Sequence, residues 1–299
     1  MKKSVSLLLA GLMLCGALAG CGGNNNTAEN TDSQTEQTSE STGTSGAIHV
    51  VSREDGSGTR GAFVELTGVE DDNGDNTTVD AEIANRTDAV LTTVAGNEAA
   101  IGYVSLGSLN DTVKAVTVDG VEATVDNVKS GTYTLSRPFN IATKGEPTGV
   151  AEDFINFILS ADGQAIVEEE NYIKVDDAAP AFTSDGSSGQ IAVGGSSSVS
   201  PVMEKLIEAY EAVNPNAQIE LQTSDSTSGM TGAMDGTFAI GMASRELKDE
   251  EAAQLTGTAI ALDGIAVIVN TANTVENLTM DQIRSIYVGE TTDWADVAA

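Results

Sequence analysis

Histidine, cysteine and aromatic residues are scarce in this sequence of 299 residues. The one histidine, His49, alternates with apolar residues, as a surface strand residue does, and nothing around it supports a Ser-His-Asp arrangement. Both cysteines lie within the first 21 residues, which leaves the rest of the chain without a disulfide or a cysteine-based metal site. Aromatic residues make up 4% of the chain, which argues against a stacking site for sugars or nucleobases.

Basic residues are also few. The sequence has 14 Lys and Arg against 45 Asp and Glu, a formal net charge of −31 at pH 7. This negative excess disfavours binding to nucleic acid. The same negative charge repels an anionic ligand. This repulsion is screened over about 8 Å at physiological salt, whereas loop dipoles act at contact distance, so an anion would have to be held by a local site.

The N-terminus has the pattern of a targeting segment. A basic start is followed by an apolar stretch, Val5–Ala19, that is too short to span a bilayer. It ends in Leu-Ala-Gly-Cys21, which resembles the lipobox of bacterial lipoproteins. We therefore expect residues 1–20 to be a lipoprotein signal peptide, Cys21 to carry the lipid, and residues 21–46 to form a disordered tether. The alternative is an ordinary secretory signal followed by an incidental cysteine.

Two segments, 47–175 and 191–299, have the alternating pattern of an α/β protein, with a Ser/Gly/Asp-rich linker over 176–190. Each opens with a short strand, a Gly/Ser loop and a helix. In the first, the strand runs into Arg53 and the loop is Glu-Asp-Gly-Ser-Gly-Thr. Such a loop aims backbone N–H groups, hydroxyls and a helix N-terminus at one point, which favours an anion.

Loops of this kind follow four predicted strands, and in open parallel sheets ligands bind at the carboxyl ends of the strands. One such loop is weak evidence, because Gly/Ser turns between strand and helix are common; four with the same chemistry point to a site. The GxxxxGK[ST] spacing of nucleotide-binding loops is absent. The loops are Ser52–Thr59, Gly194–Ser200, Ser224–Gly229 and Ser244–Glu246.

Other segments give less specific expectations. Residues 81–94 predict a helix, 113–118 a strand, and the apolar run 265–269 a parallel strand covered on both faces. The acidic stretch 69–82 is spaced loosely like a calcium loop, but Asn76 stands where that loop needs glycine, so a solvated acidic loop is the better interpretation.

Three stretches together resemble the phosphate-binding proteins of Pst-type ABC transporters. They are Val-Ser-Arg53-Glu-Asp-Gly-Ser-Gly-Thr, Gly-Gly-Ser-Ser-Ser198-Val-Ser-Pro and Ile-Gly-Met-Ala-Ser244-Arg-Glu-Leu-Lys. The resemblance covers nearly all of 48–175 and 191–299. It implies a two-lobed α/β fold of the type II periplasmic-binding-protein-like class, closing on its ligand around a hinge.

The two halves stand in the opposite order to that of the family, so the chain looks circularly permuted. One lobe would then be roughly 141–262, and the other would combine 48–138 with 263–299. The hinge would be two crossings, near Pro138–Ile141 and Leu262–Gly264. A piece of a tandem array, or a chain that exchanges halves with a second copy, is the competing interpretation.

The resemblance implies binding of inorganic phosphate without a cofactor or a metal, and delivery to the ABC permease of a phosphate importer. The lipid anchor would be the chain's only link to the membrane. Some members of the family use an Asp to accept the proton of hydrogen phosphate. The matching region here contains Arg245, which accepts no proton, and Asp55 or Asp225 could be the acceptor instead. The implied phosphate-binding residues are Arg53, Ser57, Gly58, Thr59, Ser197, Ser198, Val199 (through its N–H), Ser226, Ser244 and Arg245.

Two other classes of function stay open on the sequence alone. A phosphohydrolase using Ser57 or Ser198 as nucleophile would need a base and metal ligands that the sequence does not offer. A surface or regulatory lipoprotein could keep the fold, or oxyanion binding, without transport.

Overall fold

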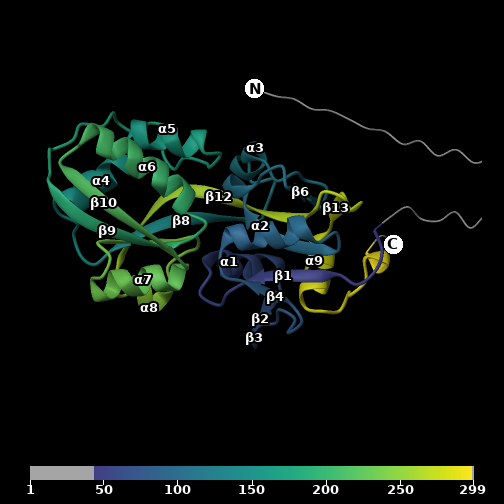
Figure 1. The fold of residues 1–299 in the computed structure, drawn as a ribbon. Helices are drawn as coiled ribbons and strands as arrows, with labels where there is room; N and C mark the ends of the chain where they lie inside the picture. Colours follow the sequence, from purple (N-terminus) through teal and green to yellow (C-terminus); the bar gives the residue numbers. More distant parts are fainter. Residues whose placement is uncertain (1–43, 298–299) are drawn as a thin grey trace, which may run out of the picture. The chain divides into compact units, whose positions relative to one another are not determined.

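The computed structural model describes residues 44–297. Two long antiparallel strands, β8 (Ser136–Thr143) and β12 (Thr256–Asn270), run through the middle of a nine-stranded sheet. They pair over most of their length and run from one group of helices to the other (Figure 1). They connect two hydrophobic cores. We call residues 139–262 the continuous lobe, and residues 44–138 with 263–297 the discontinuous lobe.

The continuous lobe holds its helices around one end of the sheet. The helix α6 begins at Ser200 with Pro201 in its first turn, a position where proline fits, and ends at Val213, with Asn214 as its C-cap. The elements of this lobe are α4 (Val150–Ile158), α5 (Ala161–Glu169), β9 (Gly189–Ser196), α6 (Ser200–Val213), β10 (Ala217–Ser224), α7 (Ser226–Asp235), β11 (Ile240–Ala243) and α8 (Asp249–Ala252).

The discontinuous lobe is assembled from both ends of the described chain. Its last helix, α9, starts with a capping box, in which Thr279 and Gln282 bond to each other's backbone N–H. The elements of this lobe are β1 (His49–Arg53), α1 (Gly58–Thr67), β2 (Glu70–Asp71), β3 (Gly74–Asp75), β4 (Glu82–Ala84), α2 (Thr87–Gly96), β5 (Ala100–Ser105), η1 (Leu106–Ser108), β6 (Val113–Ala115), β7 (Thr117–Val118), α3 (Val125–Lys129), β13 (Asn277–Leu278), α9 (Met280–Tyr287) and η2 (Trp294–Asp296).

The two lobes repeat one strand order. In the continuous lobe the order is β10-β9-β11-β8, and in the discontinuous lobe it is β4-β1-β5-β12. In each, the first three strands are parallel and the fourth, which comes from a crossing, is antiparallel. The carboxyl ends of the parallel strands in each lobe therefore share one edge of the sheet, where loops can meet.

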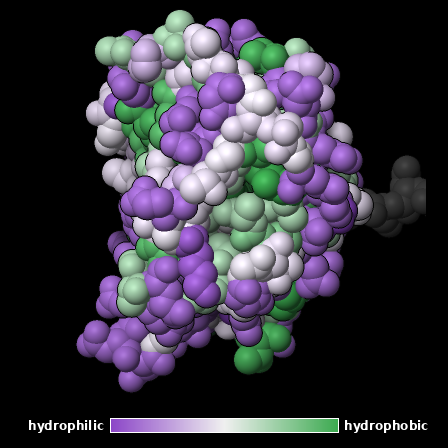
Figure 2. Space-filling model, turned by 90° about the vertical axis from the view of Figure 1, so that its left-hand side faces the viewer, coloured by the Kyte–Doolittle hydropathy of each residue, from purple (hydrophilic) through white to green (hydrophobic). Residues whose placement is uncertain are grey.

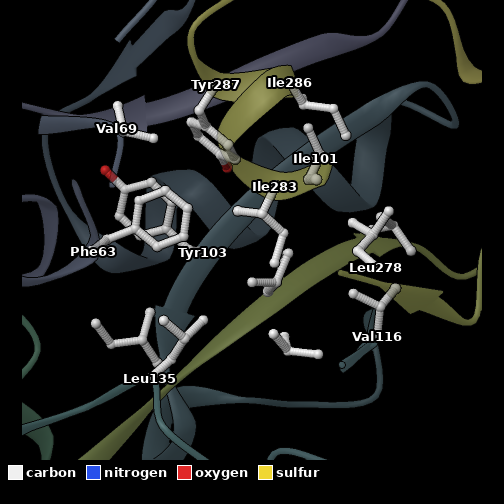
Figure 3. Close-up of a cluster of buried hydrophobic side chains, with 14 of the residues drawn as sticks. Phe63, Val69, Ile101, Tyr103, Val116, Leu135, Leu278, Ile283, Ile286 and Tyr287 are labelled. Carbon is white, nitrogen blue, oxygen red and sulfur yellow. The ribbon is translucent and has the colours of Figure 1, made fainter. Parts of the chain in front are cut away.

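Each lobe has its own apolar core. In the discontinuous lobe the rings of Phe63 and Tyr103 stack with centroids 3.9 Å apart, and Tyr287 packs on both from α9 (Figure 3). In the continuous lobe Phe154, Phe157 and Tyr210 form a comparable group. The clusters divide at Pro138 and near Leu262, close to the crossings expected from the resemblance, although Ile173 of the continuous lobe packs in the core of the discontinuous lobe.

The two ends of the described chain lie side by side in the discontinuous lobe. Ala47 and Asp293 form an antiparallel bridge, and the N–H of Trp294 donates to the carbonyl of Gly46 at 3.0 Å. The indole of Trp294 is buried and donates to the carbonyl of Ala99 at 2.9 Å. The segment at the end of the chain thus packs beside the strand that opens the fold.

Three expectations about local structure were wrong. Residues 82–84 form strand β4, not helix, because they pair in register with β1, and α2 begins only at Thr87. The run 265–269 is buried as expected, but it belongs to β12 and is antiparallel to β5, β6 and β8. The strand expected over 113–118 is divided into β6 and β7, which pair with different partners.

The surface seen from the side of the continuous lobe is mostly hydrophilic, with hydrophobic residues in small groups (Figure 2). Within residues 44–297 no helix is both long and apolar enough to cross a membrane. The expected signal peptide, Cys21 and all but the last three residues of the expected tether lie outside the described residues.

Candidate anion site

Loops from both lobes meet at the edge of the sheet, and each leads into a helix. Ser57 caps α1 and accepts a hydrogen bond from the N–H of Arg60, and Asp225 caps α7 in the same way through the N–H of Ser228. Helix α6 follows the β9 loop at Ser200. The loops therefore lead into the N-termini of three helices, each at least ten residues long. The N-terminus of a helix favours negative charge.

Seven hydroxyl side chains gather where these loops meet; we call them the hydroxyl cluster. Thr59 Oγ1 and Ser198 Oγ share a hydrogen bond of 2.8 Å between the lobes. All seven side chains belong to residues that are at most 7% exposed. The members are Thr59, Thr87, Ser196, Ser197, Ser198, Ser226 and Ser244, joined by hydrogen bonds of 2.8–3.3 Å, some through the backbone.

Arg53 brings a guanidinium to the cluster. Its Nη2 donates to Ser197 Oγ at 3.0 Å, across the lobes, and its Nη1 donates to Thr87 Oγ1 at 3.3 Å. Glu54 holds the same guanidinium through two hydrogen bonds, of 2.8 Å from Nε and 2.7 Å from Nη2. Because Arg53 is 2% exposed, this paired charge lies in a desolvated place, where electrostatic contacts are stronger than in water.

Two glycines allow the lobes to approach. A Cβ added to Gly58 would lie 2.4 Å from Ser226 Oγ and 2.9 Å from Ser244 Oγ, both in the other lobe. A Cβ on Gly56 would lie 2.2 Å from Asp225 Oδ1, and the carbonyl of Gly56 accepts from the N–H of Thr227 at 3.1 Å. A side chain at either glycine would keep the loops apart.

The remaining residues implied by the resemblance lie at the same place but with different surroundings. Val199 is buried, and its N–H donates to the carbonyl of Ser196 within the turn at 3.1 Å. Arg245 lies beside Gly58, but its guanidinium is held by Glu251 through hydrogen bonds of 2.7 and 2.8 Å and points to that carboxylate.

Neither aspartate considered as a proton acceptor reaches the hydroxyl cluster. The Asp55 side chain is 97% exposed and pairs with Arg60, and Asp225 is engaged in capping α7. His49 lies on β1 and pairs with Glu82 at 2.8 Å on a partly exposed face, as expected of a surface strand residue. Among residues 44–297 there is no group of three or more His, Cys, Asp or Glu side chains suited to a metal ion.

Sequence reasoning missed four residues at the site: Thr87, Ser196, Arg137 and Asp263. Thr87 lies inside the helix predicted over 81–94 and is the residue at which α2 begins; it comes shortly after β4, as the first anion loop comes directly after β1. Arg137 Nη2 donates to Thr59 Oγ1 at 3.0 Å, and its Nη1 lies 3.0 Å from Asp263 Oδ2. Burial raises the pKa of Asp263 to about 6, against the lowering effect of Arg137.

A cleft of about 430 Å³ adjoins the cluster between the lobes. Thr87 and Ser197 form its inner end, and Arg86, Asp88 and Glu204 line it further out. It connects the buried hydroxyls with the molecular surface. The arrangement as a whole offers hydrogen-bond donors and guanidinium charge to a small tetrahedral anion.

Comparison with known proteins agrees with this geometry. The family model of the PBP (periplasmic-binding-protein) superfamily domain matches residues 17–162 and 180–299. The chain belongs to the PBP superfamily. Among individual relatives, "Phosphate-binding protein PstS 2" of Streptococcus agalactiae is 48% identical over 304 residues, which cover 99% of this chain and 98% of that protein.

A solved crystal structure of a related protein has a similar fold. The crystal structure of a phosphate ABC transporter phosphate-binding protein from Streptococcus pneumoniae is 46% identical, with a TM-score of 0.69, and the match covers 84% of this chain and all of that one. The α/β, PBP-like fold expected from the resemblance is therefore confirmed. By contrast, "Phosphate-binding protein PstS" of Bacillus subtilis is 37% identical over 134 residues, or 44% of this chain and 42% of that protein.

Proposed function

We propose that this chain is a solute receptor that captures inorganic phosphate outside the cytoplasm and delivers it to the permease of an ABC importer. The observation that carries the proposal is the Arg53 guanidinium donating to Ser197 across the lobes, inside a buried cluster of seven hydroxyls. The names of the relatives, which describe phosphate-binding proteins, support the same ligand.

Binding is non-covalent in this account. Hydroxyls, backbone N–H groups and the Arg53 guanidinium replace the water around the ion, and closure of the lobes excludes solvent. Each hydrogen bond to a charged group contributes about 1.5–3 kcal/mol net. Several such bonds are enough for dissociation constants of about 1 μM or below once the costs of association are subtracted.

We assign the ligand contacts to residues of both lobes. The residues are Arg53, Ser57, Gly58 and Thr59 from the discontinuous lobe, and Ser197, Ser198, Val199, Ser226 and Ser244 from the continuous lobe. We assign Arg245 a different role from the one that the resemblance implied. Its pairing with Glu251 and its position against Gly58 suit a residue that steadies the closed lobes.

A role in transport can be tested in cells. Cells that lack this chain should take up radiolabelled phosphate slowly, and the wild-type chain should restore uptake. The Arg53→Gln variant, present at equal abundance, should fail to do so. Full restoration by that variant would remove Arg53 from the site, and normal uptake without the chain would contradict the transport role.

We also propose that the mature chain is held at the outer face of the cell membrane by a lipid on Cys21. The lipobox-like sequence supports this assignment. The wild-type chain should partition into a detergent phase and carry the mass of a diacylglycerol group on its N-terminal peptide. The Cys21→Ser variant should appear in the aqueous phase or keep its signal peptide; an unchanged partition would show that another feature anchors the chain.

We propose, finally, that the order of the two halves is a circular permutation. The bridge between Ala47 and Asp293 supports it, because permutation requires that the original chain once ran through the place where the ends now meet. The short match to the Bacillus subtilis protein supports it too, since a collinear alignment can cover only one half of a permuted pair. The near-complete match to the streptococcal relatives implies that they share this order.

A further inference from the structure

The two crossing strands carry a buried ion pair next to the candidate anion site. Arg137 on β8 and Asp263 on β12 stand directly opposite each other in the antiparallel pairing. Arg137 is 3% exposed and Asp263 is 0% exposed. Buried ion pairs contribute little to stability by themselves, because desolvation offsets their attraction, so their presence calls for another reason.

The Arg137 guanidinium reaches both lobes. Its Nη2 donates to Thr59 Oγ1 of the discontinuous lobe at 3.0 Å, and its Nε donates to the carbonyl of Ser244 in the continuous lobe, also at 3.0 Å. Both of these residues belong to the hydroxyl cluster. A rigid fork of donors can satisfy both acceptors only while the two loops are close together, so Arg137 holds the closed arrangement of the site.

The carboxylate of Asp263 has unusual surroundings. Both of its oxygens are buried, and within residues 44–297 the buried side-chain polar atoms without a hydrogen bond of good geometry are these two and the hydroxyls of Ser105, Ser108 and Tyr172. Arg137 Nη1 lies 3.0 Å from Asp263 Oδ2 and forms the ion pair. The Ser105 hydroxyl and the backbone N–H groups of Leu106 and Gly107 lower the pKa of Asp263, but burial outweighs them, so the ionised carboxylate is costly for stability.

The pair also affects the charge that an anion would meet. Both guanidiniums that touch the hydroxyl cluster are matched by a carboxylate, Arg53 by Glu54 and Arg137 by Asp263. In a buried site the negative charge of Asp263 is only weakly screened and acts on any anion bound beside Thr59. Asp263 therefore cancels much of the attraction that Arg137 would otherwise exert.

We propose that Arg137 and Asp263 together set the affinity of the closed site: Arg137 is a positioning residue that holds Thr59 and Ser244 for the anion, and Asp263 weakens anion binding so that the ligand can be released. This inference rests on the proposed function, since it assumes that the site binds an oxyanion. A receptor that closes too tightly would deliver its ligand slowly, and the counter-charge of Asp263 prevents this.

The test compares phosphate affinity and dissociation rate among full-length variants. Asp263→Asn keeps the shape of the side chain and removes the charge, and we expect it to bind phosphate about tenfold more tightly, with slower dissociation. Asp153→Asn is the matched control. Asp153 is similarly buried, but it accepts hydrogen bonds from Tyr210 and Ser184 in the core of the continuous lobe, so the phosphate affinity of this variant should differ from that of the wild type by less than about twofold.

A second variant removes the charge pair as a unit. Arg137→Gln with Asp263→Asn leaves no lone buried charge and loses the fork between the lobes, and we expect it to bind phosphate about tenfold more weakly than the wild type. If Asp263→Asn alone is unstable, phosphate should raise its melting temperature by more than it raises that of the wild type.

Three results would overturn the inference. They are a folded Asp263→Asn variant that binds no more tightly than the wild type, an unstable one that phosphate stabilises no more than the wild type, and a double variant of wild-type affinity. Absence of phosphate binding by the wild-type chain would instead contradict the proposed function, so the two failures are distinguishable.

Discussion

Arg53 Nη2 donates to Ser197 Oγ at 3.0 Å, from the end of β1 in one lobe to the end of β9 in the other. The two residues are far apart in the sequence and belong to two loops of similar composition, each rich in glycine and hydroxyl residues. Their contact makes a single site from two repeated strand-loop-helix units. In the structure both loops come from the same chain.

Arg53 should matter more for phosphate affinity than any exposed arginine. We expect Arg53→Gln to weaken phosphate binding by about 30-fold or more, because at least one charge-assisted contact of about 2 kcal/mol is lost in a desolvated site. The control is Arg284→Gln, whose side chain is 43% exposed and pairs with Glu290 on the surface. Calorimetric titration measures both, and an Arg53→Gln variant that binds like the control would contradict the assignment.

Gly58 should be required for closure and not for folding. In Gly58→Ala the new methyl group would lie 2.4 Å from Ser226 Oγ, so the lobes cannot close fully, and phosphate affinity should fall about tenfold or more. Gly61→Ala is the matched control on the same helix, where the nearest atom of another residue is Arg245 Cδ at 3.9 Å.

The two alanine variants should differ in both phosphate affinity and stability. Gly61→Ala should keep wild-type affinity and raise the free energy of unfolding by up to about 1 kcal/mol, since alanine favours a helix interior. Gly58→Ala should unfold near the wild-type temperature without ligand. Equal phosphate affinities of the two variants would show that the contact between Gly58 and Ser226 is not needed for binding.

The pH dependence of stability should carry the signature of Asp263. Its pKa is about 6 in the folded protein, raised by burial from 3.8, so between these values the folded state binds more protons than the unfolded state. The free energy of unfolding should therefore fall by about 3 kcal/mol through this group as pH rises from about 4 to 6, and stay level above. The titratable groups that face it, Arg137 and Tyr172, do not titrate in this range.

Comparison with Asp263→Asn isolates this contribution, because all other groups cancel in the difference. Denaturant unfolding at several pH values should show the variant gaining stability relative to the wild type as pH rises between about 4 and 6. Parallel curves would mean that Asp263 titrates in the folded protein as it does in the unfolded chain.

The proposed permutation predicts that the chain tolerates restoration of the other order. Joining Val297 to Thr44 through a Gly/Ser linker, and opening the exposed segment between Ala178 and Ala179, should give a protein that folds and binds phosphate within about threefold of the wild type. Opening the chain inside α6, between the buried residues Leu206 and Ile207, is the control and should abolish folding. Circular dichroism and titration decide between them.

The sequence was most informative where one short segment carries several functional groups. Arg53, Ser57, Gly58 and Thr59, which stay predictions as phosphate contacts, could be singled out because they lie within seven residues at the end of one strand, and the repeated loop pointed to Ser198. The division into lobes at Pro138 and Leu262 came from the resemblance, and the hydrophobic clusters match it.

Other features depend on tertiary contacts that leave no local pattern. Arg137 and Asp263 lie in ordinary apolar strands, and only the register of β8 against β12 brings them together. Residues 82–84 form a strand because β1 offers a parallel partner, an interaction that outweighs their local preference, and this hid Thr87. The direction of β12 likewise follows from its pairing with β8 and β5, since burial alone does not distinguish parallel from antiparallel strands.

Calorimetric titration of the purified full-length chain with phosphate tests the central claim most directly. Reversible unfolding beforehand would remove any anion that was purified with the protein, and chloride at equal ionic strength is the control. The account predicts one phosphate per chain, with a dissociation constant of about 1 μM or below. A correctly folded, monomeric chain that releases no heat with phosphate would contradict it.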